Sequence, residues 1–96
     1  MALLTDAEVA RDLAALPGWT RVGDAIQRQF VFSGFPDAVA FVQRLVPESE
    51  AAGHHPDITI HYRRVTVAFT THDEGGLTRL DVEGADMANR RAEPDA

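Results

Sequence analysis

The first apolar positions of the chain recur at helical spacing. They are Val9, Leu13 and Leu16. This spacing predicts a helix over about residues 6–15. The segment Thr5-Asp6-Ala7-Glu8 matches a capping box, in which the threonine and glutamate side chains each accept a hydrogen bond from the other residue's backbone N–H. Pro17-Gly18 then stops the helix.

Two extended segments follow, over about residues 19–22 and 25–32, and the turn signal Gly23-Asp24 separates them. The second segment alternates between apolar and polar residues. One side carries Ile26, Phe30 and Phe32, and the other side carries Gln27 and Gln29. This alternation predicts a hairpin with one buried face.

Helical spacing returns after Ser33-Gly34. The apolar positions are Phe35, Ala38, Val39, Val42, Leu45 and Val46. Pro36 suits the first turn of this second helix. Pro47 lies deep in the pattern, where a proline removes a backbone hydrogen bond, so the helix either kinks or breaks and restarts. We expect a kink, with the helix continuing to Ala52 and stopping at Gly53.

A second hairpin is predicted from alternation over residues 57–62 and 65–70, with Arg63-Arg64 as its turn. Ile58, Ile60 and Tyr62 share one side of the first strand, opposite Thr59 and His61. A loop is expected over residues 73–76. After it, Thr78-x-x-Asp81 is a candidate capping box for a third helix that runs to about Arg91. Residues 92–96 are expected to be a frayed tail.

These elements give the order α-β-β-α-β-β-α. We therefore predict an α+β fold with a single domain over residues 1–96, a four-stranded antiparallel sheet, and helices packed on one face. The chain has 96 residues, a size at which oligomerisation is a common supplement to a modest core.

Composition narrows the possible functions. The formal net charge is −6, which argues against a protein that binds nucleic-acid phosphates. The sequence has no cysteine, so disulfides, thiolate metal sites and cysteine nucleophiles are excluded. No segment reaches the ~20 apolar residues of a membrane span, and the N-terminus does not look like a signal peptide. The expected location is the cytoplasm.

Candidate chemistry is concentrated where the second helix gives way to a strand. The pattern Glu50-x3-His54-His55-Pro56-x5-Tyr62-x9-His72 resembles the pterin-4a-carbinolamine dehydratase family. The resemblance spans nearly the whole chain. It includes Gly18-Trp19, Phe30-x-Phe32, Phe35-x2-Ala38-x2-Phe41, Thr71-His72-Asp73, Gly75-Gly76-Leu77 and Asp81.

The resemblance implies a dehydratase that eliminates water from 4a-hydroxytetrahydropterin to give quinonoid dihydropterin, in the recycling of tetrahydropterins. It implies no metal and no organic cofactor, with a homodimer or homotetramer as the assembly. The implied catalytic residues are His54, His55, His72 and Glu50. The implied substrate-binding residues are His54, His55, Pro56, Thr71, His72, Asp73 and Glu74.

Histidine suits this reaction, because loss of the hydroxyl needs an acid and loss of a ring N–H proton needs a base. A group that titrates near pH 6.5 performs both tasks near neutral pH. We expect His54 to be the principal acid/base and His72 the second, with His55 holding and polarising the substrate. Glu50, one turn before His54, is expected to orient the His54 ring. Pro56 stiffens the loop.

Other interpretations remain open at this point. Glu50, His54 and His72 could instead hold a metal in a hydrolase. The fold could also serve as a non-catalytic dimerisation or interaction module. Ile58 departs from the family pattern, because many relatives carry an aromatic residue there. Other marked residues have structural interpretations. Trp19 and Tyr62 are expected in the core or at its rim, His61 at the surface, and Asp81 as a helix cap or a substrate contact.

Overall fold

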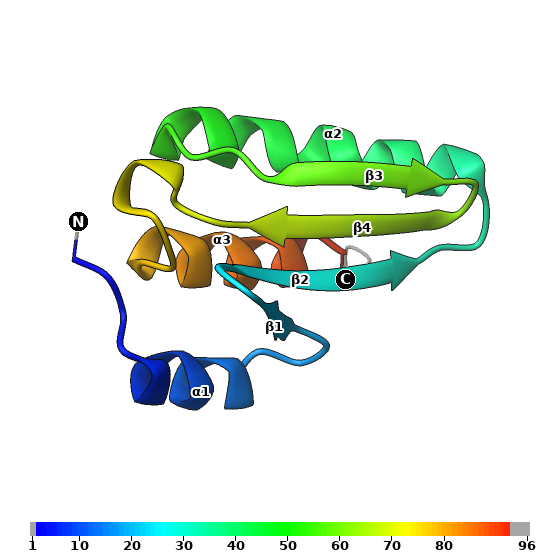
Figure 1. Cartoon of the computed structure of the whole chain (residues 1–96). Helices are drawn as coiled ribbons and strands as arrows, with labels where there is room; N and C mark the ends of the chain where they lie inside the picture. The colour runs from blue at the N-terminus through cyan, green and yellow to red at the C-terminus, as the bar shows by residue number, and fades with distance from the viewer. Residues whose placement is uncertain (1, 93–96) are drawn as a thin grey trace.

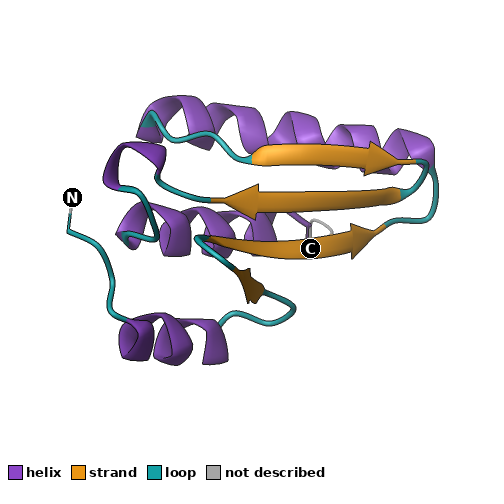
Figure 2. Ribbon diagram, viewed as in Figure 1, coloured by secondary structure: helices purple, strands orange, loops and turns teal. Residues whose placement is uncertain are grey.

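A computed structural model of the chain describes residues 2–92 and shows the predicted order of helices and strands (Figures 1 and 2). The helices are α1 (Asp6–Ala14), α2 (Phe35–Ala52) and α3 (Arg79–Ala92). The strands are β1 (Thr20–Val22), β2 (Ala25–Val31), β3 (Asp57–His61) and β4 (Arg64–Phe69), and the short 3-10 helix η1 (His72–Glu74) follows β4. Most of the predicted tail, residues 93–96, lies outside the described residues.

The four strands form one antiparallel sheet in the order β1-β2-β4-β3, which confirms the predicted α+β fold. Helix α2 connects β2 to β3, and β4 then returns between these two strands. Helices α2 and α3 cover one face of the sheet, and α1 lies beyond β1 (Figure 1). This topology brings the start of β3 and the end of β4 to the same end of the molecule. The end of α2 and the start of α3 lie at that end as well (Figure 1).

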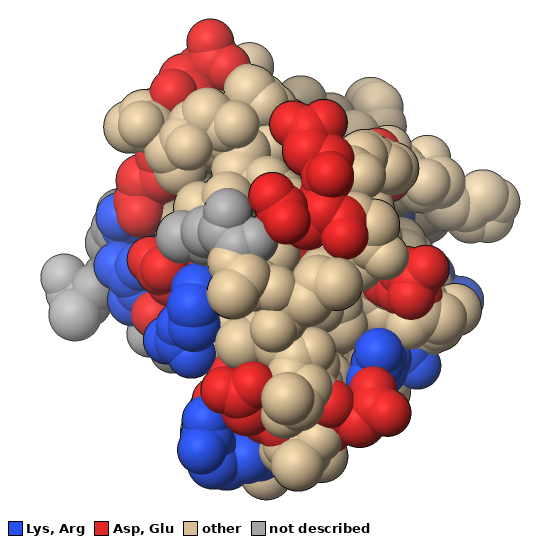
Figure 3. All heavy atoms as spheres, turned by 60° about the vertical axis from the view of Figure 1, so that its left-hand side comes forward, with Lys and Arg blue, Asp and Glu red and all other residues tan. Residues whose placement is uncertain are grey.

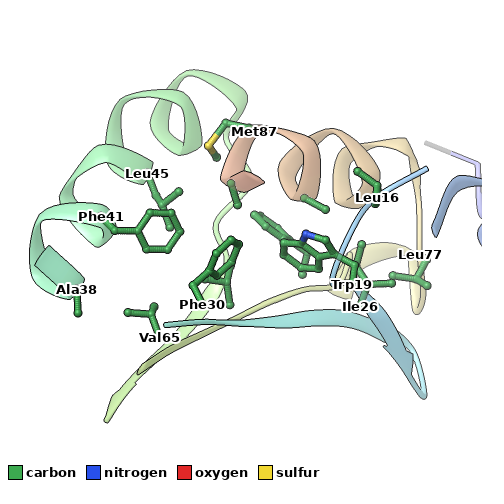
Figure 4. Packing of buried hydrophobic residues seen from close by; sticks show 14 of the residues in the cluster. Leu16, Trp19, Ile26, Phe30, Ala38, Phe41, Leu45, Val65, Leu77 and Met87 are labelled. Atoms are coloured by element: carbon green, nitrogen blue, oxygen red, sulfur yellow. The ribbon is translucent and has the colours of Figure 1, made fainter. Parts of the chain in front are cut away.

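The core lies between the sheet and these two helices (Figure 4). Ile26 pairs with Phe69, and Phe30 pairs with Val65, so the predicted buried side of β2 faces the buried side of β4. Trp19 is also a core residue, with 5% of its surface exposed. Its ring contacts those of Phe30 and Phe69, at centroid distances of 6.2 and 6.0 Å. Contacts between aromatic rings therefore form the centre of the hydrophobic core.

Helix ends agree with the sequence signals. The Thr5 side chain accepts from the Glu8 N–H at 3.1 Å, and the Glu8 carboxylate accepts from the Thr5 N–H at 2.9 Å, which confirms the first capping box. The hydrogen bond from the Thr5 backbone lowers the pKa of Glu8. Gly53 ends α2 in the left-handed conformation, with φ at 61°. Only a residue without a Cβ adopts that conformation at low cost.

Two turns differ from the prediction. The second hairpin turns at Tyr62 and Arg63 instead of Arg63 and Arg64, because Tyr62 takes the left-handed conformation with φ at 56°. Tyr62, which was expected in the core or at its rim, is therefore an exposed turn residue instead, with 65% of its surface accessible. The loop after β4 is partly helical, since residues 72–74 form η1 before Gly75 turns the chain with φ at 72°.

Helix α2 runs through Pro47 without interruption, so the alternative of a break and restart is wrong. Replacing the exposed Pro47 with alanine is expected to raise the free energy of unfolding by about 1–3 kcal/mol. The reason is that alanine restores the backbone N–H and removes the clash with the preceding turn, which outweighs the added freedom of the unfolded chain. Urea denaturation measures this difference.

Gln43→Ala is the matched control for that experiment. Gln43 is exposed in the same helix, and glutamine and alanine differ little in helix propensity, so the control should shift stability by only a few tenths of a kcal/mol. A Pro47→Ala protein no more stable than wild type would show that the helix has adapted fully to its proline.

Candidate active site

The His-His-Pro segment is a short link between α2 and β3. Gly53 ends the helix, residues 54–56 form the link, and Asp57 begins the strand. The His54 N–H donates to the Ser49 carbonyl at 3.2 Å, which folds the link back against the last turn of α2. His54 therefore leaves the helix axis, and its side chain does not follow the helical spacing that its sequence position suggests.

His54 is largely buried, with 12% of its side chain exposed. Its Nε2 atom lies 2.7 Å from Oδ1 of Asp81, on the first turn of α3. Its ring stacks on that of Phe69, the last residue of β4, with centroids 5.8 Å apart and planes inclined by 20°. Three elements therefore hold one imidazole, which is the rigidity that a proton-transfer group needs.

Asp81 is fully buried and hydrogen-bonded on both carboxylate oxygens. Oδ2 accepts from the Thr71 hydroxyl at 2.8 Å and from the Thr78 N–H at 2.9 Å, while Oδ1 faces His54. The expected helix cap is thus present, and Asp81 also orients His54. Because none of its surface is exposed, the alternative role as a substrate contact is not supported by the geometry.

Glu50 does not pair with His54, contrary to the sequence-based expectation. Its carboxylate instead forms a short contact with Nε2 of His55, and both side chains are well exposed. The physical reason is the end of α2 at Gly53. Beyond that residue the i, i+4 relation no longer holds, so His54 turns inward to Asp81 and His55 lies beside Glu50.

His72 is the exposed first residue of η1. The preceding residue, Thr71, is buried and shares the Asp81 carboxylate with His54, so the end of β4 does return to the His54 link. Asp73 and Glu74 lie in η1 and are exposed, and Pro56 is half-buried. The predicted binding segments, residues 54–56 and 71–74, are therefore joined through Asp81.

The three histidines line different hollows of the surface. His54 lines a cavity of about 190 Å³ between α2 and α3. His55 lines a groove of about 220 Å³ between α2 and β3, and His72 lines a hollow of about 240 Å³ beside Asp24. The three histidines that the family resemblance implies as catalytic therefore line three separate hollows in this structure.

The cavity beside His54 owes its shape to a close approach of α3 and β4. A Cβ atom on Gly84 would lie 2.6 Å from the Phe69 ring, so a larger residue there would displace the ring on which His54 stacks. Ala52, Leu80 and Met87 also line the cavity, together with the charged residues Glu48, Glu83 and Arg90. The result is an apolar cleft with a charged rim.

Carboxylates dominate the end of the molecule that carries the link and η1. Figure 3 views this end, and acidic side chains are spread across the centre of that face. Exposed Glu50, Asp73 and Glu74 belong to this end. Such a field disfavours an anionic substrate and suits an uncharged one.

Two further findings bear on the alternatives. Across residues 2–92, no three histidine, aspartate or glutamate side chains are grouped closely enough to hold a metal ion, so the set Glu50, His54 and His72 is not assembled. None of the helices within the same range has the length and apolar character of a membrane span.

Sequence reasoning missed the partners that position His54. The sequence indicates Asp81 only as a helix cap or a substrate contact, and it gives Phe69 no role beyond membership of the alternating segment 65–70. A signal for Asp81 did exist, because the third residue of a helix points its carboxylate back toward the preceding loop. The contact with His54 depends on the packing of α3 against the end of α2, which no local pattern records.

Comparison with known proteins agrees with this architecture. Residues 2–91 match the sequence profile of the family described as Pterin 4 alpha carbinolamine dehydratase. A relative from Thermosynechococcus vestitus, which carries the provisional name pterin-4-alpha-carbinolamine dehydratase, is 47% identical over 93% of this chain and 94% of its own. A second relative with that provisional name, from Thermomicrobium roseum, is 51% identical over 85% of this chain and 88% of its own.

Solved structures show the same fold. A protein from Brucella melitensis, described as a transcriptional coactivator/pterin dehydratase, superposes with a TM-score of 0.92 and 37% identity, over 96% of this chain and all of its own. A pterin dehydratase-like RuBisCO assembly factor of the alpha-carboxysome shares only the fold, with a TM-score of 0.63 and 19% identity over 80% of this chain and 89% of its own. The profile match, the relatives and the shared fold together place this chain in the pterin 4 alpha carbinolamine dehydratase family.

Proposed function

We propose that the protein is a hydro-lyase that converts a 4a-hydroxytetrahydropterin into a quinonoid dihydropterin and water, as a step in tetrahydropterin recycling. In this reaction the C4a–O bond breaks and the hydroxyl leaves as water after it gains a proton. A ring N–H gives up a proton, so protons balance and no electrons are transferred. The observation that supports the proposal most directly is the buried pair of His54 and Asp81.

The pair gives His54 a defined tautomer. Oδ2 of Asp81 accepts from the Thr71 hydroxyl and the Thr78 N–H, and in the proposal the carboxylate is ionised, so that Oδ1 is an acceptor as well. Nε2 of His54 therefore donates to Oδ1, and Nδ1 is the nitrogen that can accept a proton. In the proposal, Nδ1 takes the ring N–H proton and returns a proton to the leaving hydroxyl. Asp81 stabilises the imidazolium formed in between.

The remaining predicted residues have supporting roles in the proposal. His55, held by Glu50, polarises the substrate, and His72 is the second proton-transfer group. Both roles require the substrate to extend from His54 toward the separate hollows that these two residues line. The backbone of residues 54–56 and 71–74 binds the pterin ring. The chemistry calls for no cofactor, because proton transfer alone completes the dehydration.

The direct test is an assay of the purified protein with 4a-hydroxytetrahydropterin generated in place by a pterin-dependent hydroxylase. Faster appearance of quinonoid dihydropterin than in the uncatalysed reaction is the expected result. If the protein did not accelerate the reaction, the enzyme proposal would be wrong and a non-catalytic interaction module would be favoured. Activity that disappears after dialysis against a chelator would instead require a metal.

We also propose that the protein self-associates through β3. All five residues of this edge strand are exposed, including the apolar Ile58 and Ile60 on the helix-covered side of the sheet. An unpaired edge with apolar side chains favours pairing with another strand. A homodimer or homotetramer is the expected assembly.

Replacing Ile60 with lysine is expected to convert the assembly to a monomer, because it puts a charge in place of an apolar side chain on the helix-covered side of the edge strand. Sedimentation velocity measures the change in mass. Thr59→Lys is the matched control on the opposite side of the same strand, and it distinguishes loss of the apolar contact from general charge at the edge. A wild-type protein that sediments as a monomer at all concentrations would contradict the proposed assembly.

A further inference from the structure

Gly84 lies in the interior of α3, where glycine is less favourable than alanine because it gives the unfolded chain more freedom to lose. Its backbone conformation does not require a glycine. The glycines with positive φ are Gly18, Gly23, Gly53 and Gly75, and Gly84 is not among them. Other residues could therefore adopt the same backbone conformation, so the reason for a glycine lies in the space around it.

That space is taken by the ring of Phe69. A Cβ atom on Gly84 would lie 2.6 Å from one ring carbon of Phe69 and 2.7 Å from another, so one of the two groups would have to move. The Phe69 backbone is paired with Ile26 in the sheet, and only 1% of the residue is exposed. The ring of Phe69, and not its backbone, is therefore the part that would yield.

A displaced Phe69 ring would change the placement of His54. The two rings stack with their planes inclined by 20°, so the phenyl face determines the plane of the imidazole. The hydrogen bond between His54 and Asp81 fixes the position of Nε2, but by itself it allows the imidazole to rotate about the line of that bond. The stack on Phe69 restricts this rotation, and the two contacts together fix the direction of Nδ1.

We propose that Gly84 is a positioning residue for the reaction, because it leaves room for Phe69 to lie flat against His54 and so directs Nδ1 toward the substrate. This inference rests on the proposed dehydratase function, and it adds Gly84 and Phe69 to the residues on which the rate depends. Neither residue needs to touch the substrate. A small misplacement of a proton-transfer group lowers the rate steeply, because the transfer depends on distance and angle.

The test is a double-mutant cycle of Gly84→Ala, Phe69→Leu and the variant that carries both changes. Dehydration of 4a-hydroxytetrahydropterin gives kcat and KM, and NMR follows the ring protons of His54. The ring current of Phe69 shifts these proton signals, so they report the stack without any need for catalysis. Gly34→Ala is the matched control, because its backbone is extended with φ at −170° and the new Cβ would meet its nearest neighbour, Pro36, at 3.7 Å.

Gly84→Ala and Phe69→Leu are each expected to lower kcat about tenfold with little change in KM, and to move the His54 signals toward those of an unstacked histidine. The variant with both changes should also lose about tenfold, and not about a hundredfold, because the alanine then has no ring to displace. Gly34→Ala should match wild type in kcat and in the His54 signals.

Multiplied losses in the variant with both changes, or wild-type kcat and His54 signals in Gly84→Ala, would overturn this inference. A purely structural role for Gly84 would lower the urea midpoint and leave kcat and the His54 signals of the folded protein unchanged, which would overturn it as well. If Gly84→Ala did not fold, unchanged His54 signals and kcat in Phe69→Leu would contradict the role of the ring. An inactive wild type would instead overturn the proposed function, and the His54 signals of Gly84→Ala would still decide whether Gly84 controls the stack.

Discussion

Replacing His54 with glutamine is expected to lower kcat/KM for pterin dehydration by about 10²–10⁴-fold, the contribution typical of a positioned proton-transfer group. Glutamine places an amide nitrogen near the position of Nε2, so it can still donate to Asp81. It cannot accept and return a proton at neutral pH. The variant therefore separates proton transfer from the structural contact, and a coupled assay of quinonoid dihydropterin formation measures the loss.

Two comparisons make this result interpretable. His54→Ala should lose as much activity but also some stability, because it leaves one oxygen of the buried Asp81 without a partner. His61→Ala removes an exposed strand histidine outside the site and should retain wild-type activity. If His54→Gln retained most of the activity, His54 would not be the principal acid/base.

Asp81→Asn is expected to reduce both folding stability and activity. The free energy of unfolding should fall by about 2–4 kcal/mol, because a neutral amide cannot accept all three hydrogen bonds that the buried carboxylate accepts. The value of kcat/KM should fall by about 10²-fold, since the amide can present a donor to Nε2 and so favours the other His54 tautomer. Chemical denaturation and steady-state kinetics measure the two effects.

If the role of Asp81 were purely structural, Asp81→Asn would lower the folding stability without changing the tautomer of His54. Nitrogen-15 NMR of labelled histidine distinguishes the two cases. In the wild type the Nε2–H tautomer is expected, and in Asp81→Asn the Nδ1–H tautomer. Unchanged histidine resonances beside a large activity loss would contradict the positioning role. Thr78→Val is the control, because it removes the buried hydroxyl that contacts the Thr71 hydroxyl and the Leu80 N–H but leaves the Thr78 backbone N–H to bind Asp81, so it tests a loss of stability without a change at Oδ1.

The fold was largely predictable from local signals. Spacing of apolar residues located every α-helix and strand within a few positions, because burial on one face imposes a period on the sequence. Thr5-x-x-Glu8 and Gly53 marked helix ends through chemistry contained in a few neighbouring residues. The turn at Tyr62 lies one residue earlier than predicted, because tyrosine is not a residue whose presence indicates the left-handed conformation.

The contacts within the candidate site were not predictable from the sequence. His54 and Glu50 are four positions apart, and helical geometry would join them if α2 continued. The helix ends between them, and Asp81 reaches His54 across 27 positions of sequence. Such a pairing depends on how α3 packs against α2, and it requires the tertiary structure.

The position of Asp81 has an evolutionary consequence. Its carboxylate caps the N-terminus of α3 and accepts a hydrogen bond from Thr71, just after β4. These contacts stabilise the fold whether or not any substrate is turned over. The exposed His55 and His72 make no such buried contact, whereas loss of His54 would leave one oxygen of Asp81 without a partner. In a lineage where selection on catalysis relaxes, His55 and His72 can therefore change while Asp81 persists. A descendant that has become a scaffold would then keep the buried aspartate after the exposed histidines have been lost.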